Sequence, residues 1–250
     1  MKDNFSKQAS TYAQFRPVYP PELFEFLLSL VSERHIAWDC GCGNGQVAGV
    51  LAEYFDRVEA TDISQKQLDH AIRKPNIYYQ LAKAEDSGLM AGSVNLITVA
   101  QAIHWFNLDS FYREVNRVCK PGSVLAVWCY SLLSVNEETD RVIQHLYADI
   151  LGDQYWDSES HLIDEHYQTI PFPFEEIAAP EFSIHVNWSL EHLIGYLKSC
   201  SAVQHYIQRN GSDPIDQINA DLKNAWGKEE ILEVKFPLYT RIGRILSLNY

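Results

Sequence analysis

The chain has 250 residues, of which 46% are hydrophobic and 21% are charged, so it can bury the core of one large domain or of one domain with a cap. Its formal net charge of −13 disfavours proteins that grip nucleic-acid phosphates, because such proteins usually present a basic face. No run reaches the roughly 18 apolar residues of a membrane span, and the N-terminus lacks the apolar stretch of a signal peptide.

Short apolar runs alternate with helical patterns from residue 36 to residue 130. Strands are predicted at Ile36–Asp39, Val58–Asp62, Tyr78–Leu81, Val94–Ala102 and Ser123–Cys129. Helices are predicted at Val47–Phe55, from an N-cap at Ser64 to Arg73, and at Asp109–Val118. This alternation is typical of a parallel sheet with helices on both faces, in which ligands bind at the carboxyl ends of the strands.

The pattern changes after residue 131. We predict a helix over Val135–Leu151, irregular chain over 152–181, a strand at Phe182–Trp188, helices near 190–209 and 213–226, and a strand-like run over Leu232–Leu248. Pro237 should bend or interrupt that last run. The expected division is a lid with a first helix (1–35), a cofactor-binding core (36–130), a substrate-selecting cap with the sixth strand (131–226) and a closing strand (227–250).

Three glycines alternate in the stretch WDCGCGNGQ, at Gly41, Gly43 and Gly45. Glycine lets a ligand approach the backbone closely, and a dinucleotide-binding turn usually reads G-x-G-x-x-G. Here the position of that third glycine holds Gln46, and Asp39 precedes the turn, where a carboxylate repels phosphate and attracts an ammonium group. The pattern therefore favours a nucleoside with a cationic tail, and S-adenosylmethionine fits this description.

Acidic residues also follow the next two predicted strands. Asp62 comes 21 residues after Gly41, the separation expected of an acid that binds ribose hydroxyls. Ile63 could then lie against the adenine face, and Ala84 and Glu85 could meet its edge. Each feature also has a structural interpretation, since a glycine turn can serve the fold alone, Asp62 can cap a helix and Glu85 can be a solvated turn acid. Their joint occurrence at successive strand ends favours the ligand.

Several stretches together resemble class I S-adenosylmethionine-dependent methyltransferases: WDCGCGNGQ, VEATDIS, AKAEDSGLMAGSVNLITVAQAIHWF and CKPGSVLAVW. The likeness is greatest to the small-molecule branch (methyltransferase type 11) that includes trans-aconitate methyltransferase-like proteins. The N-terminal FSKQASTYAQFRPVYPPELFEFL and the late LIGYLKSCSAVQHY are similar to the same branch. The resemblance spans nearly the whole chain and is specific for the cofactor but not for the substrate.

The resemblance implies an α/β, Rossmann-like sheet of seven strands, with the last strand inserted antiparallel and a helical cap before it. It also implies a cofactor site, which comprises Tyr12, Arg16, Asp39, Gly41, Cys42, Gly43, Asp62, Ile63, Ala84, Glu85 and Gln101. Tyr12 and Arg16 would reach this site because the N-terminal segment of such proteins folds over the cofactor. Cys40 and Cys42 depart from the usual residues, which affects packing, and Cys200 replaces a frequent aromatic residue and changes the substrate pocket.

Methyl transfer from a sulfonium is an in-line displacement in which the protein mainly orients the reactants, and the demethylated product is S-adenosylhomocysteine. His104 follows the fourth strand and is the candidate catalytic residue, as a base or as an orienting group; its structural alternative is a strand-end cap. Arg16 could clamp a carboxylate of the substrate or of the cofactor, or could steady the N-terminal segment. The candidate pocket walls are Trp105, Trp128, Tyr130 and Tyr196.

The predicted cap should select a small-molecule acceptor, with a carboxylate among the acceptors considered. Its tyrosines indicate a partly apolar pocket with hydroxyl tips: Tyr147, Tyr155, Tyr167, Tyr196 and Tyr206. Its candidate cations for an acidic substrate, beside Arg16, are Arg141, Lys198 and Arg209.

Three other functions compete with this interpretation. The first is a non-catalytic S-adenosylmethionine-binding protein that acts through a partner. The others are a nicotinamide-dependent oxidoreductase, which the glycine spacing disfavours, and a nucleic-acid methyltransferase, which the net charge disfavours. Five cysteines without paired CxxC motifs disfavour a disulfide framework or a zinc site, so we expect no metal and a cytoplasmic monomer or homodimer with no membrane or nucleic-acid partner.

Overall fold

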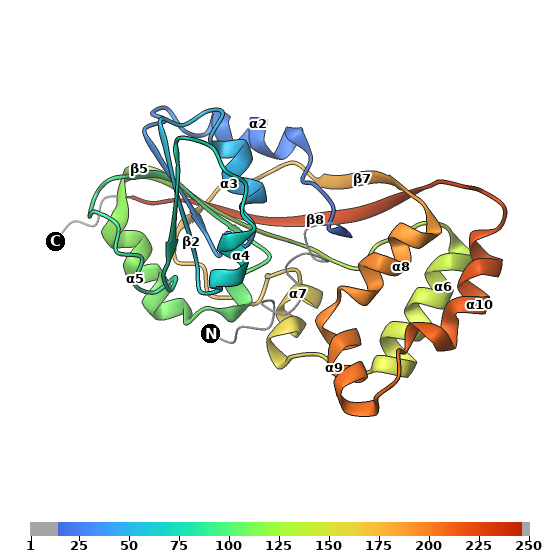
Figure 1. Cartoon of the computed structure of the whole chain (residues 1–250). Helices are drawn as coiled ribbons and strands as arrows, with labels where there is room; N and C mark the ends of the chain where they lie inside the picture. Colours follow the sequence, from blue (N-terminus) through green and yellow to red (C-terminus); the bar gives the residue numbers. More distant parts are fainter. Residues whose placement is uncertain (1–14, 247–250) are drawn as a thin grey trace.

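The computed structural model describes residues 15–246, and its central feature is a mixed sheet with the strand order β3-β2-β1-β4-β5-β8-β6, in which β7 also pairs with β8 (Figure 1). The strands are β1 (Ile36–Cys40), β2 (Arg57–Asp62), β3 (Ile77–Leu81), β4 (Val94–Ala100), β5 (Cys119–Tyr130), β6 (Glu175–Glu176), β7 (Phe182–Trp188) and β8 (Leu232–Arg244). The predicted Rossmann-like α/β fold is confirmed. The two-residue β6 is an addition to the seven expected strands.

The helices are α2 (Pro21–Ser29), α3 (Gln46–Leu51), α4 (Gln65–Asp69), η2 (Ile103–Trp105), α5 (Leu108–Val118), α6 (Glu137–His145), η3 (Leu146–Leu151), η4 (Ser158–Ser160), α7 (His161–Asp164), α8 (Leu190–Lys198), α9 (Ser201–Asn210) and α10 (Ile215–Trp226). Ser64 caps α4 as predicted, because its hydroxyl accepts a hydrogen bond from the amide of Gln67. Within residues 15–246, no helix has the length and apolarity needed to cross a membrane.

The parallel part of the sheet determines at which edge of the sheet a ligand can bind. β1 pairs with β2 on one side and with β4 on the other, both in parallel register. The strand order therefore reverses between β1 and β4, and in open α/β sheets ligands bind at the carboxyl ends of strands at such a switch point. β8 runs antiparallel to β5, as the sequence resemblance implied.

An apolar layer covers each face of the sheet, so its inner strands are buried on both faces. One layer packs α2 and α3 onto the strands through residues such as Leu23 and Leu51, and it continues into the cap helices. The other layer packs α5 against the opposite face, where Phe111 lies 6.2 Å from the ring of Trp38. The loops at the carboxyl ends of the strands are thus held between two rigid layers.

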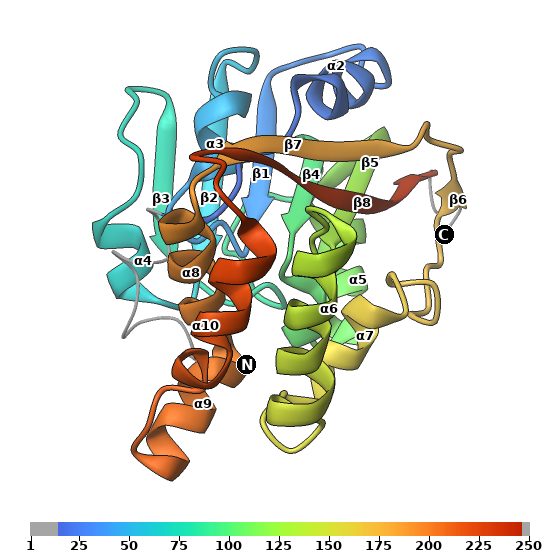
Figure 2. The ribbon, with the colours of Figure 1, turned by 90° about the vertical axis from the view of Figure 1, so that its right-hand side faces the viewer.

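The cap helices are α6, α8, α9 and α10. Figure 1 shows them gathered at one end of the molecule, away from α5, and Figure 2 shows them below the long strands β7 and β8. α10 packs against α6 and α8. Because β7 and β8 extend past the parallel strands, they carry this bundle beside the ligand edge.

The boundaries differ from the predictions where local signals compete. The predicted helix over 190–209 is two helices, and Ser199 and Cys200 separate them. Pro237 does not interrupt β8, because the strand pairs with β7 on one side through Ser183 and with β5 through neighbouring residues. The stretch 152–181, predicted to be irregular, holds the short elements η4, α7 and β6. The helix predicted over Val135–Leu151 is α6 followed by the π-helix η3.

Candidate active site

The glycine turn after β1 combines tight packing with one open position. Gly41, Gly43 and Gly45 have φ angles of +71°, +53° and +78°, which favour glycine. A Cβ on Gly41 would lie 2.7 Å from the Cβ of Ala102, so this residue is small because the loop after β4 packs on it. At Gly43, by contrast, no atom of the described residues lies within 4 Å of a Cβ position. The space over Gly43 is where a ligand can approach the backbone.

Asp62, at the end of β2, faces this turn. Its Oδ2 accepts a hydrogen bond of 2.8 Å from the amide of Gly43, and its Oδ1 accepts one of 2.8 Å from the amide of Ser64. The carboxylate thus joins the glycine turn to Ser64, the N-cap of α4. Its role in binding a ligand stays a prediction. Ile63 follows it and is half-buried.

Asp39 is buried beneath the turn. Its Oδ1 accepts a hydrogen bond of 2.9 Å from the hydroxyl of Thr98, and its Oδ2 accepts one of 3.0 Å from the amide of Ala48 in α3. Burial raises the pKa of Asp39 to about 7, and the charge of Asp62 acts in the same direction, whereas the two hydrogen bonds oppose the rise. An ammonium group beside Asp39 would favour the ionised carboxylate; that role stays a prediction.

The raised pKa of Asp39 has a consequence for stability. The folded protein keeps a proton that the unfolded chain loses above its usual pKa near 3.8, so the free energy of unfolding falls as the pH rises toward about 7. Asp39→Asn can keep both contacts, since the hydroxyl of Thr98 can accept as well as donate. From pH 5 to pH 8, the stability of this variant relative to wild type should increase by roughly 2–3 kcal/mol in urea unfolding.

A matched control for this variant is Asp221→Asn, at an exposed carboxylate on α10. Its stability should follow that of wild type across the same pH range. Parallel curves for Asp39→Asn and wild type would show that Asp39 is not the source of the pH dependence.

The loops after β3 and β4 lie at the same edge of the sheet and form the rest of the rim around the ligand space. Ala84 is buried, and the carboxylate of Glu85 accepts a hydrogen bond of 2.8 Å from the amide of Asn107 at the start of α5. Gln101 has a φ of +55°, which is rare for a residue with a side chain, and its Nε2 donates a hydrogen bond of 3.1 Å to the carbonyl of Tyr130. These contacts join the loop after β4 to the loop after β3 and to the end of β5 at one edge of the sheet.

A cavity of about 520 Å³ opens between this edge and the cap. Its core side carries Gln101, His104, Trp105 and Tyr130, from the ends of β4 and β5. Its cap side carries Tyr147 from η3 and Tyr196 and Cys200 from the α8–α9 corner, with Asp153, His161 and Asp164 from the 152–164 stretch. Since Gly41 packs on Ala102, the residue after Gln101, the cavity lies next to the glycine turn.

Several predicted residues lie elsewhere. Trp128 is fully buried, and its ring packs 5.5 Å from that of Tyr19, so the structure does not place it on the cavity wall. The cap cations also lie away from the cavity: Arg141 pairs with Glu137, Lys198 pairs with Asp213, and Arg209 lies over Tyr155. Tyr12 lies outside the described residues. Among residues 15–246, no three His, Cys, Asp or Glu side chains gather as a metal site.

Arg16 is the cation that the structure brings to the cavity. Its Nη1 donates a hydrogen bond of 2.8 Å to the hydroxyl of Tyr130, and its Nη2 donates a weaker one of 3.4 Å to the carbonyl of Ser199. The guanidinium also lies 5.2 Å from the ring centre of Tyr196. These contacts hold the guanidinium beside the cavity.

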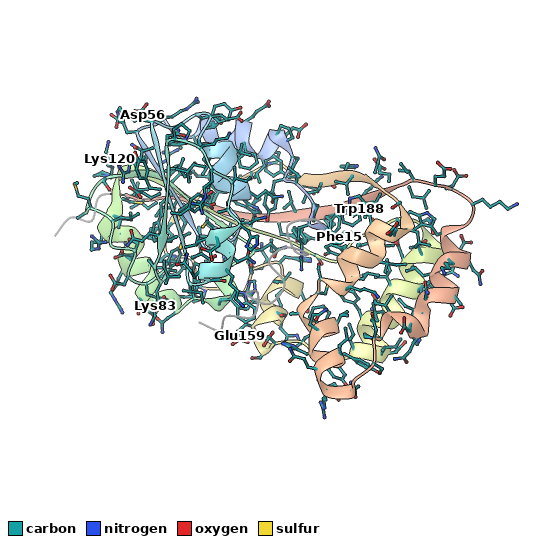
Figure 3. The ribbon with its side chains drawn as sticks, viewed as in Figure 1. Phe15, Asp56, Lys83, Lys120, Glu159 and Trp188 are labelled. Atoms are coloured by element: carbon teal, nitrogen blue, oxygen red, sulfur yellow. The ribbon has the colours of Figure 1, made fainter. Side chains whose placement is uncertain are left out.

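Phe15 anchors the segment that carries Arg16, a contact that no sequence pattern indicated. Phe15 lies beside α8 (Figure 3), 5.1 Å from the ring of His192. A Cβ on Gly195 would lie 2.4 Å from the Phe15 ring, so this glycine in the middle of a helix provides the notch for it. Two residues after Phe15, the carbonyl of Pro17 accepts a hydrogen bond of 3.1 Å from the side chain of Gln46, at the start of α3.

Gly195→Ala should separate helix stability from function. Alanine favours a helix by about 1 kcal/mol over glycine, which should offset the packing lost when the new methyl group displaces Phe15. We therefore expect a melting temperature close to that of wild type but a KM for the substrate that binds in the cavity that is raised about tenfold, because Arg16 loses its anchor. Glu191→Ala, an exposed change on α8, is the control. An unchanged KM would show that the notch does not position Arg16.

Comparisons with known proteins identify the family. A model described as a methyltransferase domain matches residues 38–127. A protein of Dictyostelium discoideum named as a methyltransferase is 36% identical over 249 residues, covering 97% of this chain and 95% of that protein. The chain belongs to the class I S-adenosylmethionine-dependent methyltransferases.

Other methyltransferases extend this likeness to the fold. A solved structure from Anaeromyxobacter dehalogenans, described as a type II methyltransferase, is 42% identical with a TM-score of 0.86, and the match covers 93% of this chain and 99% of that one. A Saccharomyces cerevisiae protein named as an S-adenosylmethionine-dependent methyltransferase is 29% identical over 136 residues, which is 51% of this chain and 47% of that protein.

S-adenosylmethionine is the cofactor of this methyltransferase. The residues present fit it, because the backbone at Gly43 faces open space and the carboxylate of Asp62 lies at the same turn. Asp62 would hold the ribose hydroxyls, and the loops that carry Ile63, Ala84 and Glu85 would meet the adenine. The bound cofactor would supply a methyl group on a positively charged sulfur.

Proposed function

We propose that this methyltransferase transfers the methyl group to an oxygen of a small carboxylic acid held in the 520 Å³ cavity. The observation that supports this most is Arg16, which lines a cavity together with aromatic side chains such as Trp105 and Tyr147, beside the loop that packs on the glycine turn. A guanidinium presents a planar set of donors that matches a carboxylate. The cavity volume falls in the range of small-molecule sites.

The proposed reaction requires little of the protein beyond the positioning of the two reactants. A carboxylate is ionised at neutral pH, so its oxygen can attack the methyl carbon without a base. The new bond joins oxygen to the methyl carbon, the carbon–sulfur bond breaks, and its electron pair neutralises the sulfonium. Correct alignment of the two reactants can lower the activation free energy by about 7–11 kcal/mol. In this proposal, Arg16, Gln101 and the cavity walls align the acceptor.

His104 is better suited to hold an acceptor than to take a proton from it. Burial lowers the pKa of its imidazole to about 3, with a small opposing effect from the charge of Glu159. Such a group is uncharged at neutral pH and is a weak base. This agrees with an acceptor that is already ionised.

The experiment that tests the proposed function is a screen of acceptors that follows formation of S-adenosylhomocysteine. The panel should contain aliphatic and aromatic carboxylic acids, their amides and the matching amines. We expect turnover with acids, methyl esters as products and no turnover with the amides. Turnover with amines alone would overturn the carboxylate proposal, and cofactor binding without turnover on any acceptor would favour the non-catalytic alternative.

A further inference from the structure

His104 makes a close contact with the side chain of Tyr167. Its Nδ1 lies 2.7 Å from the hydroxyl oxygen of Tyr167, and both side chains are buried. His104 stands on the short helix η2 after β4, whereas Tyr167 lies between α7 and β6, 63 residues further along the chain. Because His104 lines the cavity and its Nδ1 faces Tyr167, Nε2 is the ring nitrogen left to meet an acceptor.

The backbone around Tyr167 is strained and firmly held. His166 and Tyr167 have φ angles of +55° and +57°, which residues with side chains rarely adopt. Arg241 of β8 donates a hydrogen bond of 3.1 Å to the carbonyl of Tyr167 and one of 2.7 Å to that of Ile170. The ring of His166 stacks on Tyr239 with a centroid distance of 3.5 Å. A costly conformation is thus maintained at the residue that contacts His104.

The salt bridge of Arg241 strengthens this support. Its Nη2 lies 2.5 Å from a carboxylate oxygen of Glu176 in β6, and Arg241 itself is only 8% exposed. The guanidinium therefore links β8, β6 and the turn before β6. The backbone of Tyr167 is thus tied to β8, the closing strand of the sheet.

The chemistry of the two groups assigns the proton between them. A phenol hydroxyl is a good donor and a weak acceptor, whereas the unprotonated nitrogen of an imidazole is a good acceptor. The stronger arrangement has the Tyr167 hydroxyl donating to Nδ1, and a neutral imidazole must then carry its proton on Nε2. The burial that keeps His104 neutral prevents both nitrogens from being protonated at once.

We propose that Tyr167 is a positioning residue that fixes His104 as an Nε2–H donor, which holds an oxygen of the methyl acceptor in the cavity. The inference rests on the proposed function for the identity of the acceptor but not for the tautomer. An acceptor carboxylate would then be held by two groups, with Arg16 on one side and the N–H of His104 on the other. His104 acts by orientation, not as a base.

The tautomer is tested directly by ¹⁵N NMR of the protein labelled on its nine histidines. The signal of His104 is identified by its loss in His104→Gln. We expect a protonated Nε2 and an unprotonated Nδ1 in wild type at neutral pH. A protonated Nδ1 would overturn the proposal, whatever the result of the acceptor screen.

Two tyrosine variants test the role of the hydroxyl. Tyr167→Phe removes it and keeps the ring, and we expect His104 to show a mixture of tautomers and kcat with the acceptor to fall about tenfold, with unchanged S-adenosylmethionine affinity. The matched control is Tyr112→Phe, since the buried Tyr112 hydroxyl donates to the carbonyl of Pro171 in the same segment but does not contact His104. It should keep the wild-type tautomer and kcat. A wild-type tautomer in Tyr167→Phe would remove Tyr167 from the role.

Conservative replacement of His104 separates a donor from a base. Glutamine offers an N–H near the position of Nε2 but cannot accept a proton, so His104→Gln should keep several-fold more activity than His104→Ala. Equal loss of activity in both variants would contradict a donor role. If no acceptor is found, the NMR result still decides the tautomer.

Discussion

Asp62→Ala is expected to weaken S-adenosylmethionine binding by roughly 100-fold or more. Two hydrogen bonds from ribose hydroxyls to a carboxylate contribute about 1.5–3 kcal/mol each, and 1.4 kcal/mol corresponds to a tenfold change in Kd. The variant also loses the two backbone contacts that join the glycine turn to α4, through Gly43 and Ser64. Isothermal titration calorimetry with S-adenosylmethionine and S-adenosylhomocysteine measures the effect.

The control for this variant is Asp69→Ala, at the end of the same helix α4, where the exposed carboxylate accepts a hydrogen bond from Gln65. Its cofactor affinity should stay within about twofold of wild type. An Asp62→Ala protein that is folded and binds the cofactor with wild-type affinity would remove Asp62 from the site.

Arg16→Met is expected to raise the KM for a carboxylate acceptor by about 10- to 100-fold. Methionine keeps much of the length of the side chain but removes the charge, and hydrogen bonds to charged groups contribute about 1.5–3 kcal/mol. The cofactor affinity should change less than threefold, because the guanidinium faces the cavity side of the rim, between Tyr130 and Tyr196. Steady-state kinetics with an acid from the screen gives both values.

Two further variants serve as controls for this prediction. Lys198→Met removes a nearby cation that pairs with Asp213 and does not line the cavity, so its KM should match wild type. Arg16→Lys keeps the charge but not the planar donor geometry, and should fall between wild type and Arg16→Met. A loss of cofactor affinity in Arg16→Met at an unchanged acceptor KM would assign Arg16 to the carboxylate of the cofactor.

The ligand edge could be predicted from the sequence because local patterns determine it. A continuous apolar run such as the one in β4 is buried on both faces and so indicates a strand of a parallel sheet. The polar residues directly after such runs, including Asp62 and Gln101, then have to meet at one edge. In the structure, the side chains of Asp62 and Gln101 join neighbouring loops at this edge, through hydrogen bonds with the amide of Gly43 and the carbonyl of Tyr130.

The roles of side chains at that edge were harder to predict, because they depend on partners distant in sequence. Asp39 precedes the glycines as a ligand residue would, yet both its oxygens accept bonds within the fold, from Thr98 and Ala48. Trp128 lies two residues before the end of β5, and its ring packs against Tyr19 and Phe24. Tyr130, at the end of the strand, lines the cavity instead.

The cap side of the cavity could be predicted only in part: Tyr147 and Tyr196 were expected there and line it, whereas the 152–164 stretch was not expected. The stretch 152–164 has no regular hydrophobic period, so nothing in it indicates that Asp153 and Asp164 face the cavity. Tyr167 was predicted only as a polar tip of the cap, since its contact with His104 joins segments 63 residues apart. The notch at Gly195 depends on Phe15, 180 residues away, and a lone glycine in a helix carries no sign of its partner.

The most direct test of the whole account is a crystal structure of the protein with S-adenosylhomocysteine and an acid from the screen. The account predicts the ribose hydroxyls at the carboxylate of Asp62, the sulfur beside Gln101 at the mouth of the cavity, and the acid between Arg16 and His104. A sulfur atom that faces away from the cavity, or an acid bound outside it, would contradict the account.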